Sequence, residues 1–353
     1  MRKNYLDNIR IFCIYILIPF HLFLAFNCWD EANYVFFVPN RILSSIIMLF
    51  SPWFMPLLFL IAGISARHSL ERRTAGKFIF ERVKKLMVPL VAGVLTICPF
   101  MAYTADKFHN GYSGSYFEHY KIFFSKVTDF TGYDGGFTPG HFWFLLYLFI
   151  ASILALGVIL LQRKFFPEFS CKKIPLPAIL LLFFPAQLFD MILNFNGKSI
   201  GLSFILFLFG YYVFYECPVI QKIKKTSLIL FGLGIAFTAA NIDMFLWAKN
   251  IDGCVNFIVS KLSMWFMMLG VLGLFAQFFD KSNGISRYLS ANSFLFYEFH
   301  FFWLLLFQMM SFELTGEYVF SSILTLLISY TATFLTIEIM KRIPLVKFLF
   351  GAK

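Results

Sequence analysis

Two ionisable residues, Arg10 and His21, lie eleven positions apart in the first apolar stretch of this chain, around IRIFCIYILIPFHLF. In an α-helix, eleven steps return to within about 20° of the same face, about 16 Å further along the axis. We therefore expect Arg10 at a membrane surface and His21 within the hydrocarbon. An ionisable side chain at that depth is costly and marks a pathway or reaction site. The alternative is a histidine that only hydrogen-bonds a neighbouring helix.

A second histidine opens a later apolar stretch. His141 follows Pro139 and Gly140, and Trp143 comes two positions after it. Tryptophan is enriched at membrane interfaces. We therefore expect His141 near the outer membrane surface, with Trp143 as an interfacial anchor.

A third histidine, His300, lies on a polar face of another apolar stretch. Ser293, Tyr297 and His300 follow i, i+4, i+7 spacing, which places them on one face of a helix. Glu298 is two positions from His300, about 160° around the helix, and is expected to face elsewhere. The remaining histidines are expected in solvated loops: His68, His109 and His119.

A neutral imidazole in such a site can carry out two kinds of chemistry. As a general base it takes the proton of a hydroxyl group. As a nucleophile it holds an acyl group briefly. The sequence does not separate these two mechanisms.

Several motifs that would point to other chemistry do not occur in the sequence. It contains no Walker loop, H-E-x-x-H or H-x-x-x-x-D motif. The six cysteines form no C-x-x-C pair, so we expect no metal cofactor and no redox motif. Cys28 and Cys254 are the two cysteines predicted outside, and a disulfide between them stays an open alternative. These observations argue against hydrolase and ATPase activities.

The segment from Ala66 to Pro89 concentrates seven cations between apolar stretches. Within it, Arg82, Lys84 and Lys85 lie one turn before the third apolar span. Cations in this position could bind the phosphates of a nucleotide-bearing donor. The same charges could instead anchor the chain to anionic lipids. Anchoring is the expected role for three other residues: Arg67, Arg72 and Arg73.

The composition indicates a polytopic membrane protein with an all-α helical bundle. The chain is 59% hydrophobic and 14% charged, and its apolar runs of about 17–25 residues match the length of membrane-spanning helices. We predict about ten transmembrane helices in a single integral-membrane domain over residues 1–353. The predicted spans are 9–27, 43–64, 86–103, 141–162, 176–194, 200–216, 228–247, 257–279, 289–310 and 318–340.

The distribution of positive charge predicts the topology. If the N terminus is cytoplasmic, 23 of the 30 Lys and Arg residues fall on the cytoplasmic side. Both termini are therefore predicted in the cytoplasm, and the net charge of +11 follows from topology. A nucleic-acid-binding protein would need a basic soluble domain with base-stacking aromatics, and none is evident. The expected surroundings are the lipid bilayer, with no nucleic acid.

One predicted outer loop, residues 104–140, is long and contains six glycines and many aromatics. Loops of this length tend to be functional. Two interpretations stay open. The loop could cover a cavity or present stacking faces to sugar rings, or it could lie as an amphipathic cap on the lipid headgroups.

The order of these motifs resembles the acyltransferase 3 family of bacterial integral-membrane acyltransferases over nearly the whole chain. YLDNIRIFCIYILIPFH resembles the family's first helix, with its Arg and His at Arg10 and His21, and PLLFLIAGIS resembles its second. HFWFLLYLF resembles the H-x-W-F-L segment, with His141 and Trp143. FLFYEFHFF resembles the late helix that carries a second intramembrane histidine, here His300.

The chain departs from the family pattern at three places. FIFERVKKLMVP resembles a segment with two arginines three apart, but Lys85 stands in place of the second, after Arg82. Lysine keeps the charge and loses bidentate geometry. Ala62 and Gly63 stand where Ser-Gly is usual, and Glu298 is not part of the pattern.

The closing EIMKRIPLVKFLF resembles the end of periplasmic glucan succinyltransferases, a branch of this family.

The resemblance implies an O-acyltransferase of the bacterial cytoplasmic membrane. The implied donor is cytoplasmic acyl-CoA, with acetyl or succinyl as the acyl group, and the implied acceptor is a hydroxyl of an extracytoplasmic carbohydrate or other envelope molecule. A homodimer is a further arrangement that the sequence leaves open. The alternative function is a transporter or flippase of a lipid-linked or amphipathic solute.

The resemblance and the residues together give three sets of candidate site residues. The catalytic set is His21 and Arg10. The donor-binding set is Arg82, Lys84 and Lys85. The supporting or acceptor-orienting set is His141, Trp143, Tyr297, Glu298 and His300.

Overall fold

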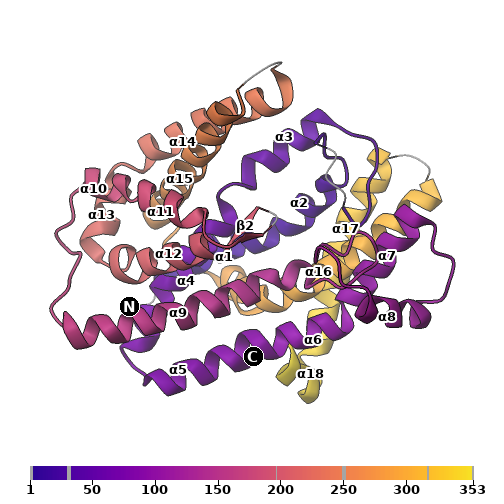
Figure 1. Cartoon of the computed structure of the whole chain (residues 1–353), viewed down its shortest axis with the longest axis horizontal. Helices are drawn as coiled ribbons and strands as arrows, with labels where there is room; N and C mark the ends of the chain where they lie inside the picture. Colours follow the sequence, from indigo (N-terminus) through magenta and orange to yellow (C-terminus); the bar gives the residue numbers. More distant parts are fainter. Residues whose placement is uncertain (1–2, 30–32, 196, 249–251, 316–317, 352–353) are drawn as a thin grey trace. The chain divides into compact units, whose positions relative to one another are not determined.

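The computed structural model of the protein describes residues 3–29, 33–195, 197–248, 252–315 and 318–351. Within them almost every regular element is a helix (Figure 1). The strands among these residues are β1 (Asn194–Phe195) and β2 (Lys198–Ser199), which form one short antiparallel hairpin. The predicted all-α fold is confirmed.

The α-helices have the following bounds in chain order: α1 (Asn4–Tyr15), α2 (Leu17–Leu24), α3 (Arg41–Phe50), α4 (Phe54–Leu70), α5 (Ala75–Arg82), α6 (Val88–Thr96), α7 (Cys98–Asn110), α8 (Tyr116–Ser125), α9 (Trp143–Phe165), α10 (Leu176–Leu181), α11 (Phe183–Asp190), α12 (Ile200–Phe209), α13 (Cys217–Lys225), α14 (Ser227–Ile242), α15 (Gly253–Phe278), α16 (Gly284–Thr315), α17 (Tyr318–Met340) and α18 (Pro344–Leu349). Shorter helical turns of other types are the π-helical η1 (Val83–Met87), η3 (Gly210–Phe214) and η4 (Asp243–Trp247) and the 3₁₀ turn η2 (Gly140–Phe142).

Eight helical segments among the described residues are long and apolar enough to cross a membrane. Together they make the protein a polytopic membrane protein, because only helices and closed barrels satisfy their backbone polar groups in lipid. Each of the eight overlaps a predicted span. The segments are 4–24, 41–70, 75–110, 140–165, 227–247, 253–278, 284–311 and 319–340.

The structure differs from the prediction at the fifth and sixth predicted spans. Helices α10 and α11 together cover only residues 176–190, which is about 22 Å of helix and too short for a 30 Å hydrocarbon core. The sixth span passes the length test only together with α13, across a 98° bend. Pro218 lies at the start of α13, where proline ends one helix and begins another.

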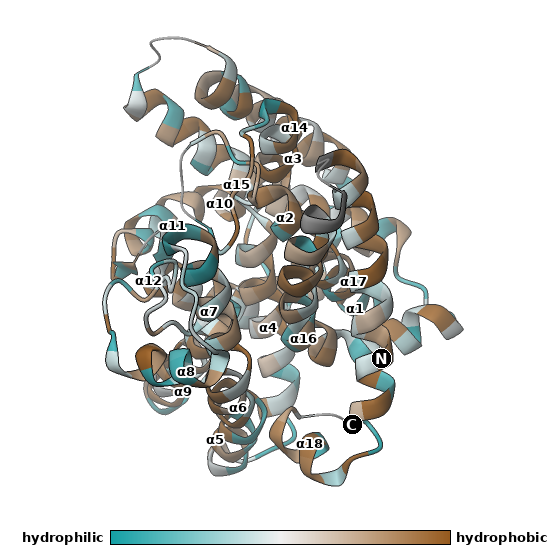
Figure 2. Ribbon diagram, turned by 90° about the vertical axis from the view of Figure 1, so that its right-hand side faces the viewer, coloured by the Kyte–Doolittle hydropathy of each residue, from teal (hydrophilic) through white to brown (hydrophobic). Residues whose placement is uncertain are grey.

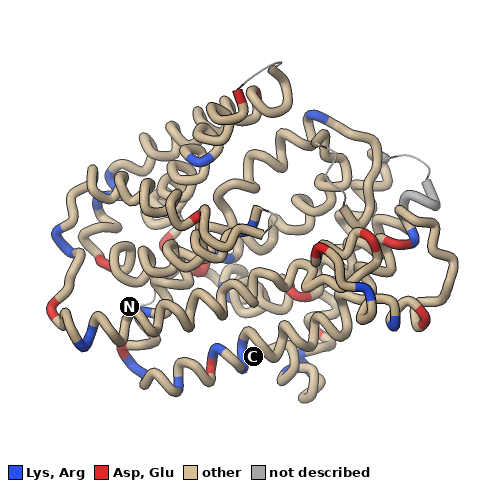
Figure 3. The backbone as a smooth tube through the Cα atoms, in the orientation of Figure 1, with Lys and Arg blue, Asp and Glu red and all other residues tan. Residues whose placement is uncertain are grey.

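Charge and hydropathy are distributed as expected for membrane helices. Hydrophobic residues cover most of the helical ribbon (Figure 2). Lys and Arg gather at helix ends and in connecting segments, whereas long stretches of helix carry no charge (Figure 3). Many large apolar side chains are exposed on helix surfaces, for example Leu161, Leu188 and Ile323. Lipid tails would cover such side chains in a membrane.

The chain forms two compact units, each made of three separate segments. Unit 1 consists of Met1–Cys13, Met48–Val83 and Leu146–Ser286. Unit 2 consists of Ile14–Ile47, Lys84–Leu145 and Arg287–Lys353. The residues that could carry chemistry therefore fall into two groups, which are described in turn below.

Close backbone packing in unit 1 depends on two glycines. A Cβ atom on Gly63 of α4 would lie 1.9 Å from the carbonyl oxygen of Phe207. A Cβ atom on Gly210 of η3 would lie 2.0 Å from the carbonyl oxygen of Leu60. Small residues allow membrane helices to approach this closely. The two glycines thus fix α4 against α12 and η3.

Candidate active site

His21 lies just after a helix break that Pro19 explains. Helices α1 and α2 are separated at Ile16. Pro19 has no N–H to donate to the carbonyl oxygen of Tyr15, four residues earlier. The Tyr330 hydroxyl of α17 donates to that freed carbonyl instead. The lost hydrogen bond follows from the chemistry of proline, and the structure identifies the group that replaces it.

His141 is positioned by a tight turn at the start of the fourth span. It lies in the 3₁₀ turn η2, directly after Gly140, whose φ is +51°. A Cβ atom on Gly140 would lie 2.9 Å from both the sulfur and the methyl carbon of Met101. Glycine at this position therefore meets a conformational and a steric requirement at once. The turn leaves the His141 side chain buried, at 6% exposure.

Two reciprocal hydrogen bonds hold His141 against α16. The Tyr297 hydroxyl donates to the His141 carbonyl oxygen at 2.5 Å. In return, Nε2 of His141 donates to the backbone carbonyl oxygen of Glu298 at 3.1 Å. Buried polar groups satisfied in this way rigidify a site. Tyr297 is therefore bonded directly to His141.

The three predicted intramembrane histidines come together in unit 2. The ring centre of His300 lies 5.6 Å from that of His21 and 5.2 Å from that of His141. The Phe301 ring packs against all three, at 4.4 Å from His21, 5.6 Å from His141 and 6.0 Å from His300. We call His21, His141 and His300 the histidine cluster. It joins residues from α2, η2 and α16 that are up to 279 positions apart in the sequence.

Two imidazoles of the cluster present a proton-accepting nitrogen. A carbonyl oxygen can only accept, so Nε2 of His141 and Nδ1 of His300 are donors; His300 donates to the Tyr297 carbonyl oxygen at 2.7 Å. In a neutral imidazole the other nitrogen then carries a lone pair. Among the described residues, Nδ1 of His141 and Nε2 of His300 have no hydrogen-bond partner. These nitrogens are suited to accept a proton.

The described residues contain no group of three His, Cys, Asp or Glu side chains that could hold a metal ion. All six cysteines, including Cys28 and Cys254, carry free thiols.

The other predicted supporting residues contribute differently. The Glu298 side chain is fully buried, and neither of its carboxyl oxygens has a hydrogen-bond partner among the described residues. Its backbone, not its carboxyl group, contacts His141. Trp143 is half-buried at the first position of α9, and its ring centre lies 6.3 Å from that of Phe144. Phe144 in turn packs against Tyr297, at 6.0 Å.

Arg10, from the predicted catalytic set, and Arg82, from the predicted donor-binding set, belong to unit 1. Arg10 forms an ion pair with Asp7 at 2.9 Å and also donates to the Ser65 hydroxyl of α4. Arg82 lies close enough to Arg10 for their charges to interact, and its guanidinium lies 4.8 Å from the Phe78 ring. Two cations held together in this way favour an anionic ligand.

Lys84 and Lys85, from the same predicted donor site, belong to unit 2. Both lie in the π-helical turn η1, directly after Arg82. The Lys84 ammonium lies 5.7 Å from the Phe348 ring, and both lysines are exposed. The regular three-residue spacing from Arg82 to Lys85 on one α-helix is therefore interrupted, because α5 ends at Arg82.

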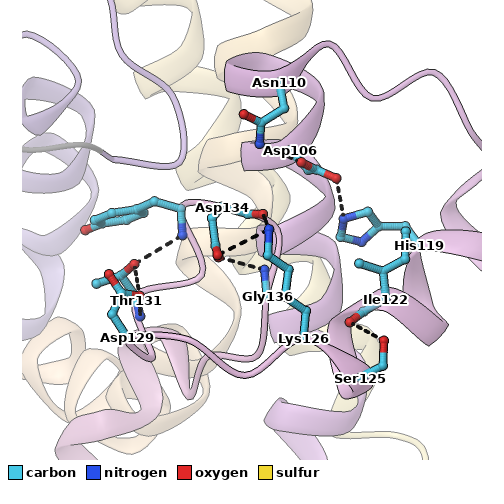
Figure 4. A network of polar contacts seen from close by, with 11 residues as sticks. Asp106, Asn110, His119, Ile122, Ser125, Lys126, Asp129, Thr131, Asp134 and Gly136 are labelled. Atoms are coloured by element: carbon cyan, nitrogen blue, oxygen red, sulfur yellow. Dashed lines mark hydrogen bonds and ion pairs between the residues drawn. The ribbon is translucent and has the colours of Figure 1, made fainter.

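Residues 104–140, predicted as an outer loop, contain the end of α7 and the whole of α8. Helix α8 begins with a capping box between Ser115 and Glu118. Beyond it, Asp134 accepts from the Gly136 amide at 3.0 Å and pairs with Lys126 at 3.2 Å (Figure 4). Many aromatic rings of α7 and α8 contact one another, such as Tyr103 and Tyr116 at 5.6 Å. Both interpretations of this segment, as a cover or sugar platform and as an interfacial cap, stay open.

The prediction that three histidines lie in loops is wrong, and the predicted solvation fails for His119, whereas His109 is exposed. His68 lies in α4, His109 in α7 and His119 in α8. His119 is fully buried and contacts Asp106 at 3.1 Å (Figure 4). The reason is that α7 and α8 pack together and enclose the imidazole between the rings of Tyr103 and Tyr112. His119 lies in α8, which is not part of a membrane-length apolar helix.

Burial of His119 predicts that the protein loses stability in mild acid. Burial lowers the pKa of His119 below its ordinary value of 6.5, and the attraction of the Asp106 carboxylate only partly opposes this. The folded state therefore favours the neutral ring. Above pH 6.5 the imidazole is neutral in both the folded and the unfolded state. Below pH 6.5 the unfolded state binds the proton first, so the free energy of unfolding decreases as the pH decreases. Thermal unfolding of detergent-solubilised protein between pH 8 and pH 5.5 measures this.

The matched variant for this test is His119→Gln, which keeps a hydrogen-bond donor toward Asp106 but does not titrate. We expect the variant to be less stable than the natural protein at pH 8, with the difference shrinking as the pH falls. The pH 8 comparison is the internal control. A difference that stays constant across the range would contradict the assignment.

Sequence reasoning missed two residues of the site. Phe301 contacts all three histidines, and Tyr330 occupies the carbonyl group freed by Pro19. Phe301 follows His300 directly, in a run of aromatics that offers no distinguishing signal. Tyr330 has no sequence signal either, because its role depends on the contact between α17 and α2, which are far apart in the sequence.

Membrane-spanning helices around buried, hydrogen-bonded imidazoles define an integral-membrane protein equipped for proton or group transfer. Residues 3–334 match the family described as an acyltransferase domain. The chain belongs to this acyltransferase 3 family, and it is a membrane acyltransferase. Comparison with curated proteins and with solved structures gave no match.

Proposed function

We propose that the protein is an O-acyltransferase that moves an acetyl or succinyl group from cytoplasmic acyl-CoA to a hydroxyl of an extracytoplasmic carbohydrate or other envelope molecule. The single observation that carries the proposal is the histidine cluster, which lies inside membrane-spanning segments of a chain that belongs to an acyltransferase family. Transfer to a hydroxyl requires a group that accepts its proton, and the cluster supplies imidazole nitrogens with that capacity.

In this proposal His21 is the catalytic histidine. As a general base it takes the acceptor's hydroxyl proton while the oxygen attacks the thioester carbonyl, and the leaving thiolate of coenzyme A then takes that proton. As a carrier it attacks the thioester itself, releases coenzyme A as the thiol, and passes the acyl group to the hydroxyl. His300 and His141 keep the ring of His21 in place or orient the acceptor.

The remaining residues are assigned by charge and contact. Arg10, Arg82, Lys84 and Lys85 stabilise the phosphates of the donor. Tyr297 holds His141 through its hydroxyl, and Trp143 and Glu298 shape the acceptor side of the same unit. The predicted location is the cytoplasmic membrane of a bacterium, with the donor and the acceptor on opposite sides.

Acyl transfer by the purified protein tests this function. Reconstituted protein is incubated with labelled acetyl-CoA or succinyl-CoA and with envelope glycans, and free thiol and acylated glycan are measured. We expect coenzyme A release that depends on the acceptor, with label on the acceptor by mass spectrometry. Donor hydrolysis that is indifferent to the acceptor, or no turnover with either donor, would contradict the proposal.

The alternative function is transport of a lipid-linked or amphipathic solute. One observation favours it: the 98° bend between 200–214 and 217–225 is a broken apolar helix, and transporters often bind their solutes at broken helices. Solute flux across proteoliposomes without any change in the acyl groups of the solute would support transport and contradict the proposed transfer.

A further inference from the structure

A cluster of arginine and tyrosine side chains in unit 1 is not part of the donor site described above. Arg163, near the end of α9, donates to the Tyr211 hydroxyl at 3.0 Å. The guanidinium carbon of Arg67, in the last turn of α4, lies 5.0 Å from the centre of the Tyr211 ring. Tyr211 is buried, at 1% exposure. Two cations from separate helices therefore converge on one buried phenol.

The local backbone holds this arrangement in place. Tyr211 lies in η3, a π-helical turn, a feature that is rare and often marks functional sites. Two neighbouring residues of α9 contact two neighbouring tyrosines of η3. Arg163 donates to the Tyr211 hydroxyl, and Gln162 accepts from the Tyr212 hydroxyl at 3.3 Å. Gly210 packs η3 directly onto the backbone of α4. Close packing of α4 and η3 thus fixes Arg67 and Tyr211, and Arg163 reaches Tyr211 from α9 through its side chain.

Positive charge exceeds negative charge around Tyr211. Glu71 is the carboxylate in contact with the cluster, and it pairs with Arg67 at 3.3 Å. The Tyr215 hydroxyl also lies 2.8 Å from each oxygen of Glu71. Among the described side chains, no carboxylate forms an ion pair with Arg163. One positive charge therefore stays uncompensated beside a second guanidinium.

A third cation, Lys3, lies at the edge of the cluster. Its ammonium lies 5.0 Å from the Tyr215 ring and donates to the Tyr215 carbonyl oxygen at 3.0 Å. Glu216 and Asp280 are the carboxylates whose charges act on Lys3 besides Glu71. Lys3 is thus balanced by its own acidic neighbours, and the excess charge remains at the two arginines.

We propose that Arg67, Arg163 and Tyr211 form a phosphate-binding site. A guanidinium has five N–H donors in a planar fork that matches a phosphate, and Arg163 uses one of them within the protein. By the predicted topology, α4 and α9 end and α13 begins on the cytoplasmic side, where soluble nucleotides and anionic phospholipid headgroups both present phosphate. If the phosphate belongs to coenzyme A, the site rests on the proposed function and adds a donor subsite to it.

Binding measurements on full-length protein test the site. The protein is placed in nanodiscs of phosphatidylcholine, with or without phosphatidylglycerol, and titrated with coenzyme A, 3′-dephospho-coenzyme A or pyrophosphate. The variants are Arg67→Gln, Arg163→Gln and Tyr211→Phe. Arg72→Gln is the matched control, because it removes the same charge from an exposed position on the same segment. Size-exclusion profiles verify that each variant is folded.

We expect Arg67→Gln and Arg163→Gln to weaken coenzyme A and pyrophosphate binding at least about tenfold, since each removes charged hydrogen bonds. Tyr211→Phe should weaken binding less, because both cations remain. If the natural protein binds 3′-dephospho-coenzyme A as weakly as the Arg163→Gln variant binds coenzyme A, the site binds the 3′-phosphate. If the lipid is the source, phosphatidylglycerol raises the Tm of the natural protein and of Arg72→Gln only.

The outcomes separate the site from the proposed function. A natural protein that binds pyrophosphate or responds to phosphatidylglycerol, but binds no coenzyme A, retains the phosphate site and contradicts the acyl-CoA donor. The site itself is overturned if folded Arg67→Gln and Arg163→Gln behave like Arg72→Gln with all the phosphate probes and with phosphatidylglycerol.

Discussion

Replacing His21 with alanine is expected to abolish acyl transfer while leaving the protein folded. The side chain is half-buried and packs on Phe301, so its removal costs ring contacts but leaves the reciprocal hydrogen bonds between η2 and α16 intact. Loss of a general base lowers turnover by about 10²–10⁴-fold. Loss of an acyl carrier removes the reaction route altogether. The measurement is acceptor-dependent coenzyme A release, with Tm as a check on folding.

A single-turnover experiment with the natural protein distinguishes the two roles of His21. Labelled acyl-CoA is mixed with protein in the absence of acceptor and quenched at neutral pH. An acyl carrier gives labelled protein and an equal amount of free coenzyme A, whereas a general base gives neither. His109→Ala is the matched control, because it removes an exposed imidazole from α7, outside the histidine cluster. Full turnover by His21→Ala would exclude both roles.

The sequence predicts the parts of the site that depend on local signals. Pro19 beside His21 and the Pro139–Gly140 pair before His141 each have a direct backbone consequence, and the structure contains both. The 3.6-residue period predicts that Tyr297 and His300 share a face. Both side chains do contact His141, at ring distances of 5.4 and 5.2 Å. Local geometry of this kind is fixed within one or two turns of helix.

The sequence does not predict the parts of the fold that depend on contacts between distant segments. Hydropathy predicts a membrane span at residues 176–194. Helices α10 and α11 are too short to cross a membrane, because α11 ends at Asp190. The Asp190 carboxylate pairs with Lys261, a distant residue that hydropathy does not consider. Arg67 is predicted as a lipid anchor because charge at a helix end is typical of anchors. Its contact with Tyr211, 144 positions away, has no local signal.

Breaking the ion pair between Asp190 and Lys261 is expected to cause the largest loss of stability of any single charge change considered. The Lys261 ammonium lies 2.5 Å from the Asp190 carboxylate, and the side chains are 22% and 8% exposed. Lys261→Met leaves the Asp190 carboxylate buried without its partner, so we expect it to lower the free energy of unfolding in mixed detergent micelles by about 3–5 kcal/mol. Asp190→Asn leaves the Lys261 ammonium, which is 22% exposed and partly hydrated, so we expect a smaller loss.

The double variant Asp190→Asn with Lys261→Met should recover most of the loss, since no unpaired charge then remains and buried pairs often contribute little net stability. The matched control is Lys126→Met, which breaks the exposed pair with Asp134, where side chains are 42% and 37% exposed. Exposed pairs contribute about 0–1 kcal/mol, so this change should be small. Single variants no less stable than Lys126→Met, or a double variant whose loss equals the sum of the single losses, would show that the two charges are not coupled.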